Sequence, residues 1–203
     1  MNETITLRPR FGQVLTVVVG LIVLAGLVSF VIVGDYVGLG KYVALMLLLA
    51  FLPWLLFWSP SVTVDPGGVV IRNLIREHRV TWPAIERIDT RFALELFTPK
   101  GKITAWAAPA PSRNASQRAA KSDLRNMPES TYGPGGSIRP GDLTTSLSGQ
   151  ASYLVRQRWD ALRDAGHLDA GVVEGTGVKT RWLWVNIAVL VVLVVATLVS
   201  LGL

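Results

Sequence analysis

The sequence of 203 residues contains no cysteine and only two histidines. Without cysteine, the chain has no disulfide, no thiolate nucleophile, no iron–sulfur cluster and no cysteine-based zinc site. His78 and His167 lack a second histidine or an acidic pair at metal-ligand spacing, so we expect each to be structural or exposed to solvent. Residues 175–180 lack the spacing of a phosphate-binding loop. We therefore expect no catalytic residue, no metal and no cofactor.

Charged side chains are absent from three long hydrophobic runs, at residues 11–33, 42–58 and 182–203. Because a helix needs about 20 apolar residues to cross the hydrocarbon core of a bilayer, these runs predict three transmembrane helices. The first two would be joined by a short external loop over residues 34–41. A cleaved signal peptide is the alternative for the first run. That run is longer than the usual apolar core of about 7–15 residues, and no A-x-A cleavage site follows it.

Basic residues near the runs predict the orientation of the chain in the membrane. Arg8 and Arg10 precede the first run, whereas the loop after it has one acidic and one basic residue. Residues 59–181 contain 17 Lys and Arg against 12 Asp and Glu. Basic residues close to a span resist translocation. We therefore predict a multi-pass protein of the inner (plasma) membrane, with the N-terminus (residues 1–10) and the central domain in the cytoplasm and the C-terminus outside.

The central segment alternates short runs of β-branched residues with turn signals, a pattern typical of an antiparallel sheet or barrel. Pro83 interrupts the pattern, because proline cannot continue a central ladder. The edges of such a sheet invite aggregation unless the sheet closes or is covered. The expected strands are residues 61–64, 69–73, 77–81, 87–91, 94–98 and 102–106.

Residues 59–107 also carry a recurrent order of motifs: a hairpin V-x-V-D-x-x-G-V-x-I-R-N, then V-x-W-x-x-I, then two short strands. The residues concerned are Val62, Val64, Asp65, Gly68, Val70, Arg72, Asn73, Val80, Trp82 and Ile85. This order resembles the bacterial pleckstrin-homology-like (PH-like) domain of many actinobacterial membrane proteins, in which paired N-terminal spans are typical. The resemblance implies a small β-barrel capped by a C-terminal helix, and no established reaction. The expected fold is therefore an α+β membrane protein, with three transmembrane helices and a capped, PH-like antiparallel barrel or sheet.

The capping helix is expected over residues 150–166, because apolar residues recur there on one helical face. Ser148 is expected to cap the start of this helix, and Gly166 to close its end. Residues 167–181 would link the helix to the third span. The apolar face, which we expect to pack on the sheet, consists of Ala151, Leu154, Val155, Trp159 and Leu162.

A long insertion, residues 108–149, separates the last expected strand from this helix and is rich in Ala, Pro, Ser, Gly and Arg. Loops of this length in compact domains are usually functional or disordered, and the sequence leaves open a flexible loop and an ordered loop that binds a partner. A short helix over residues 115–125 fits within it. The candidate loop contacts are Tyr132, Arg139 and Asp142.

Basic side chains crowd the expected barrel and form a candidate interaction surface for a protein partner or for anionic lipid headgroups, to which each basic residue near a membrane contributes about 1 kcal/mol. Acidic residues are interspersed, so ordinary surface charge is the alternative. No basic stretch combines with exposed aromatic residues on a recognisable nucleic-acid-binding fold, so we expect no nucleic-acid partner. The candidate residues are Arg72, Arg76, Arg79, Arg87, Arg91, Lys100 and Lys102.

These observations predict a membrane-anchored, non-enzymatic scaffold or adaptor, whose partners are the lipid bilayer and a protein or lipid headgroups bound by the cytoplasmic domain. None of the three runs contains Asp, Glu, Lys, Arg or His, whereas ion pathways and polar substrate sites in membranes usually need one. A pump or carrier is therefore disfavoured. The alternatives are an accessory or regulatory subunit of a membrane enzyme or transporter that acts through its spans, and an enzyme with its site in residues 108–149.

Overall fold

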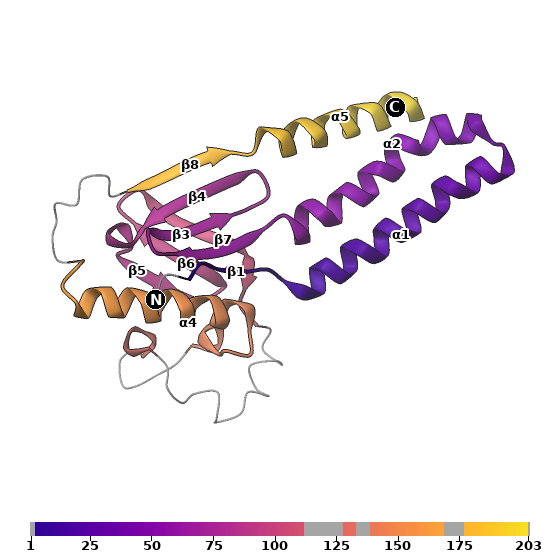
Figure 1. The fold of residues 1–203 in the computed structure, drawn as a ribbon. Coiled ribbons are helices and arrows are strands. Elements are labelled where there is room, and N and C mark those ends of the chain that lie inside the picture. Colours follow the sequence, from indigo (N-terminus) through magenta and orange to yellow (C-terminus); the bar gives the residue numbers. More distant parts are fainter. Residues whose placement is uncertain (1–2, 112–127, 133–138, 169–176, 203) are drawn as a thin grey trace. The chain divides into compact units, whose positions relative to one another are not determined.

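The computed structural model describes residues 3–111, 128–132, 139–168 and 177–202 (Figure 1). The chain divides into two compact units. The helical unit comprises Pro9–Pro60 and Trp182–Leu203, and the β unit comprises Met1–Arg8 and Ser61–Arg181. Within the described residues, the β unit contains the strands, one further α-helix and the remaining short helices, apart from the last residue of the final strand.

The helical unit contains α1 (Arg10–Val33), α2 (Tyr36–Pro53), the π-helical turn η1 (Trp54–Trp58) and α5 (Trp184–Leu201). In the part of the chain that the structure describes, three helical segments are long and apolar enough to cross a membrane: α1, α2 together with η1, and α5. Within the unit, α2 packs against both α1 and α5. The three helices expected from the uncharged runs are therefore present, and their insertion in a membrane stays a prediction.

The connection between the first two helices is shorter than expected. Helix α1 ends at Val33 and is followed by Gly34, whose φ of 75° is left-handed. Helix α2 starts directly after Asp35, whose side chain accepts the backbone N–H of Gly38 at 2.8 Å. The predicted loop over residues 34–41 is thus reduced to a two-residue turn, because Gly34 ends the first helix and the next residue, Asp35, caps the start of the second. Lys41 consequently lies within the helix rather than before it.

The larger sheet of the β unit has the strand order β1-β2-β3-β4-β8. Its strands are β1 (Ile5–Leu7), β2 (Ser61–Asp65), β3 (Gly68–Arg72), β4 (Arg76–Thr81) and β8 (Val178–Trp182). The three central strands confirm the sequence prediction. The two edge strands, β1 and β8, were not predicted as strands but as parts of the N-terminus and of the linker. They are short and mostly exposed, so their sequences lack the apolar alternation that indicates a strand.

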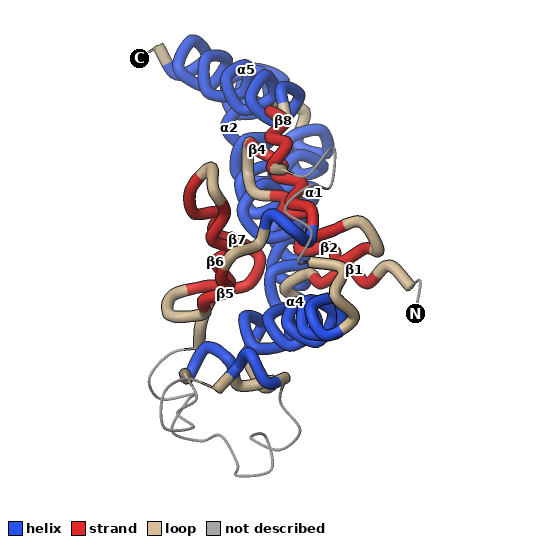
Figure 2. Tube along the Cα trace, turned by 90° about the vertical axis from the view of Figure 1, so that its left-hand side faces the viewer, coloured by secondary structure: helices blue, strands red, loops and turns tan. Residues whose placement is uncertain are grey.

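The smaller sheet has the order β5-β6-β7 and consists of β5 (Arg87–Asp89), β6 (Ala93–Thr98) and β7 (Gly101–Pro109). The two sheets are not joined into a closed barrel, which corrects the expectation of a barrel (Figure 2). The 3-10 turn η2 (Trp82–Ala84) interrupts the chain between β4 and β5. A side chain bridges the sheets instead: the Asn73 amide donates to the carbonyl of Thr104 at 2.9 Å and accepts the N–H of Trp106 at 2.9 Å.

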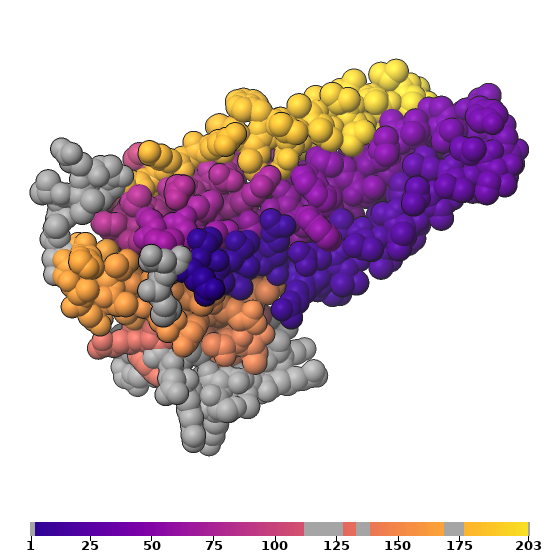
Figure 3. Space-filling view, viewed as in Figure 1, coloured from indigo at the N-terminus to yellow at the C-terminus, as the bar shows by residue number. Residues whose placement is uncertain are grey.

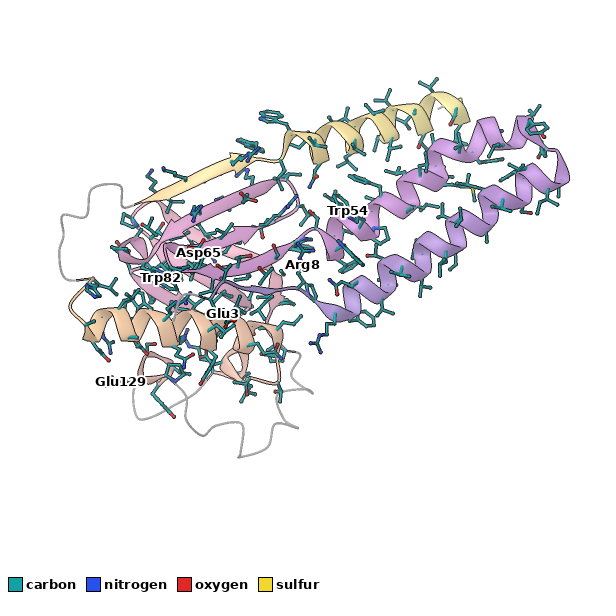
Figure 4. All side chains as sticks on the ribbon, viewed as in Figure 1. Glu3, Arg8, Trp54, Asp65, Trp82 and Glu129 are labelled. Atoms are coloured by element: carbon teal, nitrogen blue, oxygen red, sulfur yellow. The ribbon has the colours of Figure 1, made fainter. Side chains whose placement is uncertain are left out.

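The residues of the PH-like motif are structural. Trp82 is 3% exposed, and its indole N–H donates to the carbonyl oxygens of Asp65 at 3.2 Å and Pro66 at 3.1 Å in the β2–β3 turn (Figure 4). Asp65 itself accepts the N–H of Gly67 at 2.8 Å and pairs with Arg79. The motif therefore closes a hairpin and fills the core, and the carboxylate and indole it contains are engaged within the fold.

Helix α4 (Leu147–Asp164) covers the core formed by the two sheets and is the predicted capping helix. Its outer side forms part of the surface of the β unit (Figure 3). The N-cap is Ser146, which accepts the N–H of Gly149 at 2.9 Å, and not Ser148, which is buried and donates to the carbonyl of Gly141 at 2.7 Å. Gly166 has a φ of 73° just beyond the end of the helix, as the sequence predicts.

Two short helices of the long insertion are held against α4 by buried charges. They are η4 (Glu129–Thr131) and η6 (Pro140–Asp142). The Arg156 guanidinium on α4 binds Asp142 at 3.3 Å and also donates to the carbonyl oxygens of Ser130 and Ile88. These described parts of residues 108–149 are therefore ordered against the core. The short helix considered over residues 115–125 lies outside the described residues.

Candidate functional site

The outward face of the β5-β6-β7 sheet is made of polar and aromatic residues in two cross-strand rows. Because side chains alternate between the faces of a strand, residues that pair across strands share a face. One row is Arg87, Phe97 and Lys102, and the next is Asp89, Glu95 and Thr104. The row between them, Ile88, Leu96 and Ile103, faces the core and is buried. The alternation of residues along the strands thus places charged side chains on the outward face and apolar side chains on the core face. We call the outward face, with its two rows, the platform.

This platform forms the floor of an open groove with a volume of about 700 Å³. The β5–β6 turn, residues 110–111 after β7, and residues 139–141 at the start of η6 supply its remaining walls. Four basic side chains from three separate parts of the chain meet here. They are Arg87, Arg91, Lys102 and Arg139.

Two of the four basic residues are paired with carboxylates of the groove. Lys102 binds Glu95 at 2.9 Å, and Arg139 binds Asp89. Both carboxylates are largely buried, with side-chain exposures of 7% for Glu95 and 13% for Asp89. Burial raises the pKa of Asp89, but the hydrogen bond from Arg139 and the backbone N–H groups of Arg91 and Thr90 outweigh it and hold this pKa below 3.8. Asp89 and Glu95 thus each pair with one of the four cations.

The other two cations, Arg87 and Arg91, stack on aromatic rings. The Arg87 guanidinium lies 3.9 Å from the ring centre of Phe97, and the Arg91 guanidinium lies 5.2 Å from that of Phe92. No ion pair joins either guanidinium to a carboxylate of the described residues. A stacked guanidinium keeps its N–H groups at its edge, where they can form two parallel hydrogen bonds to a carboxylate or phosphate. The groove is therefore suited to binding an anion.

The remaining predicted cations lie elsewhere on the β unit. Arg79 pairs with Asp65 on the five-stranded sheet, and Arg72 is half-buried at the end of β3. Lys100 lies in the β6–β7 turn and donates to the carbonyl of Val178 at 3.2 Å. Arg76 begins β4 and lines a different hollow. The seven candidate residues thus do not form a single surface.

The three candidate loop contacts have different environments. Tyr132 is 43% exposed at the end of η4, and Arg139 lines the groove. Asp142 is 1% exposed and is bound to Arg156, so it is corrected from a partner contact to a core residue. The segment around Asp142 is rich in glycine and proline and gives no sign of burial. The burial of Asp142 could not be predicted, because its partner, Arg156, lies outside this segment on α4.

The two histidines take separate places in the β unit. The Nδ1 atom of His78 lies 3.0 Å from the hydroxyl of Thr180, and this contact connects β4 to β8. Burial, together with the charge of Arg76, lowers the pKa of His78 from 6.5. His167 is exposed beyond the end of α4. Among the described residues, no three His, Asp or Glu side chains are grouped closely enough to hold a metal ion.

Sequence reasoning missed the aromatic and acidic members of the groove. Phe92 and Phe97 orient the two arginines, and Asp89 and Glu95 neutralise the other two cations. The period-two spacing of Arg87 and Asp89 on one strand, and of Glu95 and Phe97 on the next, could have shown that each pair shares a face. The register that aligns the two strands could not be predicted, because it depends on the length of the β5–β6 turn.

Residues 59–134 match the family model of the bacterial PH domain. The match extends past residue 107, so the family pattern includes part of the insertion as well as the strands. No curated protein and no solved structure matches the chain.

Proposed function

From the premise that residues 59–134 form a bacterial PH domain, we propose that the chain is a membrane-anchored, non-enzymatic binding protein whose groove holds an acidic segment of a protein partner. The domain family supports a role in binding or as a scaffold. The groove on the three-stranded sheet supplies the site, and the three apolar helices supply the anchor.

The membrane anchor is supported by the helices and by the charges beside them. All three segments have the length and composition of spans, and α1 exposes apolar side chains along most of its length. Arg8 and Arg10 before α1, and Lys179 and Arg181 before α5, favour a cytoplasmic β unit and an outside C-terminus at the inner (plasma) membrane. A reporter fused after Leu203 should be active only outside the cytoplasm, and one inserted at Asn126 only inside.

The single observation that carries the binding proposal is the pair of ring-stacked arginines in the groove. Because Arg87 and Arg91 have no carboxylate partner among the described residues, their charge is available to a ligand. Hydrogen bonds between ionised groups contribute about 1.5–3 kcal/mol each when they are sheltered from water, and less in a groove that is open to water.

The groove favours a peptide over a single headgroup because of its size and its rim. A groove of about 700 Å³ is larger than one phosphate needs. Its rim presents Phe92, which is 69% exposed, and Pro140, which give apolar contacts to neighbouring side chains of a peptide. Clustered cations and aromatic residues at a partly apolar site are typical of protein-binding surfaces.

The test uses the full chain in nanodiscs of phosphatidylcholine and a fluorescent hexaglutamate peptide. We expect binding that weakens with salt, and a loss of about tenfold or more in affinity for R87Q and R91Q, since each removes a charge-assisted contact. R79Q is the matched control, because Arg79 is an exposed arginine on the other sheet. Its affinity should equal that of the wild type.

Equal affinity of R87Q, R91Q and R79Q would overturn the assignment of the groove, and so would the absence of any binding of hexaglutamate. A second probe, the soluble headgroup glycerophosphoglycerol, separates the two chemistries. If it binds in an Arg87-dependent way and hexaglutamate does not, the groove recognises lipid headgroups and the proposal of a protein partner is wrong.

A further inference from the structure

One end of the five-stranded sheet collects the points at which the chain enters or leaves the apolar helices. Leu7 at the end of β1 lies opposite Val62, next to Ser61 at the start of β2. Hydrogen bonds of Thr81 to Gly177 and of His78 to Thr180 make β8 antiparallel to β4, so the last residue of β8 reaches this same end. We call this the tethered end of the sheet.

The links at the tethered end are short and aromatic. Residues 8–9 separate β1 from α1, residues 59–60 separate η1 from β2, and Leu183 alone separates β8 from α5. Each link spans at most about 3.5 Å per residue. Trp54 and Trp58 lie in η1, and Trp182 and Trp184 flank Leu183 with ring centres 6.0 Å apart. Tryptophan is enriched where a span meets the headgroup region.

The β3–β4 turn, residues 73–75, emerges at the tethered end, because Arg72 pairs with both Ser61 and Glu77. It carries two consecutive apolar residues, Leu74 and Ile75, and the latter is 36% exposed. An apolar pair at the tip of a turn is unusual in water, where polar and small residues dominate turns.

The turn is held against β7 and is extended there by a third apolar side chain. The Asn73 N–H donates to the carbonyl of Arg76 at 2.8 Å, and the Asn73 amide forms the two hydrogen bonds to β7 described above. The strand residue at this seam is Trp106, which is 52% exposed. Leu74, Ile75, Arg76 and Trp106 share the lining of a shallow hollow of about 410 Å³. The apolar group is therefore formed in advance rather than on contact.

We propose that Leu74, Ile75 and Trp106 form an apolar wedge that inserts into the headgroup boundary of the bilayer in which the chain is anchored, while Arg76 meets lipid phosphate. This inference rests on the proposed membrane anchor but not on the groove. Links of one or two residues hold the tethered end at the bilayer surface. Indole and branched aliphatic side chains gain free energy at that boundary, and arginine is attracted to anionic headgroups. The wedge fixes the orientation of the domain on the membrane.

The absence of cysteine allows a direct test with single-cysteine variants of the full chain. I75C, P66C and I22C are each labelled with the environment-sensitive fluorophore NBD and reconstituted in vesicles of phosphatidylcholine and phosphatidylglycerol. Pro66 is the matched control, because it is exposed in the β2–β3 turn at the opposite end of the same sheet. Ile22 is 65% exposed near the middle of α1 and reports on membrane insertion itself.

We expect the label at position 75 to have blue-shifted emission and to be quenched by lipids spin-labelled near the headgroup. The label at position 66 should instead be quenched by aqueous iodide. The label at position 22 should respond to lipids spin-labelled deep in the acyl chain. If position 22 responds and position 75 behaves like position 66, the wedge is wrong and the anchor stands. If position 22 responds to aqueous iodide, the membrane anchor fails and the wedge fails with it.

Discussion

Arg139 and Asp142 lie in one short segment but belong to two regions with opposite properties. Arg139 lines the open groove and has a side-chain exposure of 54% in its pair with Asp89. Asp142 lies beneath α4 in a buried network, in which Arg156 contacts Asp142 and the carbonyl oxygens of Ser130 and Ile88. The side-chain exposures of Asp142 and Arg156 are 1% and 6%. The sequence presents the two residues as equivalent loop charges.

The difference shows that burial decides what a charged pair does. In the network, removal of one partner leaves a charge without compensation in a medium of low dielectric, so the pair maintains the fold. In the groove, water screens each pair, so its contribution to stability is small and its charges remain available to a ligand. Four predictions test this comparison, in order of decreasing effect on the free energy of unfolding.

The substitution D142A should destabilise the β unit by about 3–5 kcal/mol, because Arg156 would remain buried without its carboxylate. Urea unfolding of the full chain in detergent, followed by circular dichroism of the β unit, measures the change. The double variant D142L/R156M is the control and should lose much less, since it removes both charges. A single variant within about 1 kcal/mol of the wild type would contradict a structural role for the pair.

The substitution G141A should destabilise the fold by about 1–3 kcal/mol at the boundary between the two regions. A Cβ atom at Gly141 would lie 1.9 Å from the carbonyl oxygen of Thr90, so the backbone has to move. P140A changes the exposed neighbour and serves as the control. An unchanged urea midpoint for G141A would contradict the close approach of Gly141 to the carbonyl of Thr90.

The substitution R139Q should cost about 0–1 kcal/mol near neutral pH, because the pair with Asp89 is partly exposed. Asp89 has a folded-state pKa below its ordinary 3.8, so its ionised form stabilises the fold above pH 3.8 and this contribution is lost as the pH falls through the folded value. The difference between R139Q and the wild type should therefore shrink below pH 3.8. Urea midpoints measured from pH 3 to pH 7 would reveal the opposite trend if Arg139 did not stabilise the carboxylate.

The substitution R87Q should leave the free energy of unfolding within about 0.5 kcal/mol of the wild type, as expected for an exposed side chain that forms no ion pair with any described residue. The same variant is the one expected to lose binding of hexaglutamate. Thermal unfolding and peptide binding measured on one preparation separate the two properties. A parallel loss of stability would indicate that Arg87 supports the sheet rather than a ligand.

Most of the fold could be predicted from the sequence, because the environment of a residue in a helix or strand largely follows from its neighbours in the chain. Apolar runs predicted the three helices, alternation predicted β2 to β7, and helical spacing predicted α4. The N-cap of α4 was misplaced because two serines of equal propensity, Ser146 and Ser148, compete for it. Packing decides between them, since the Ser148 hydroxyl is directed to the carbonyl of Gly141.

The groove could be predicted only in part from the sequence. Arg87, Arg91, Lys102 and Arg139 were all candidates, but nothing in the sequence separates them from the other four candidates, Arg72, Arg76, Arg79 and Lys100. Strand register brings Arg87, Phe97 and Lys102 into one row, and a contact across the molecule adds Arg139. The edge strands β1 and β8 were missed for the same reason, because short exposed strands are defined by their partners.

The sequence by itself determined which segments are apolar helices, which are strands and which helix covers them, because hydrophobic period and length are local properties. Only the tertiary structure decided that the sheets stay open, that Asp142 is buried and that two stacked arginines share a groove. These features depend on register, on side chains that bridge distant elements and on burial. Each is set by residues far apart in the chain, and their free energies become defined only when the core has formed.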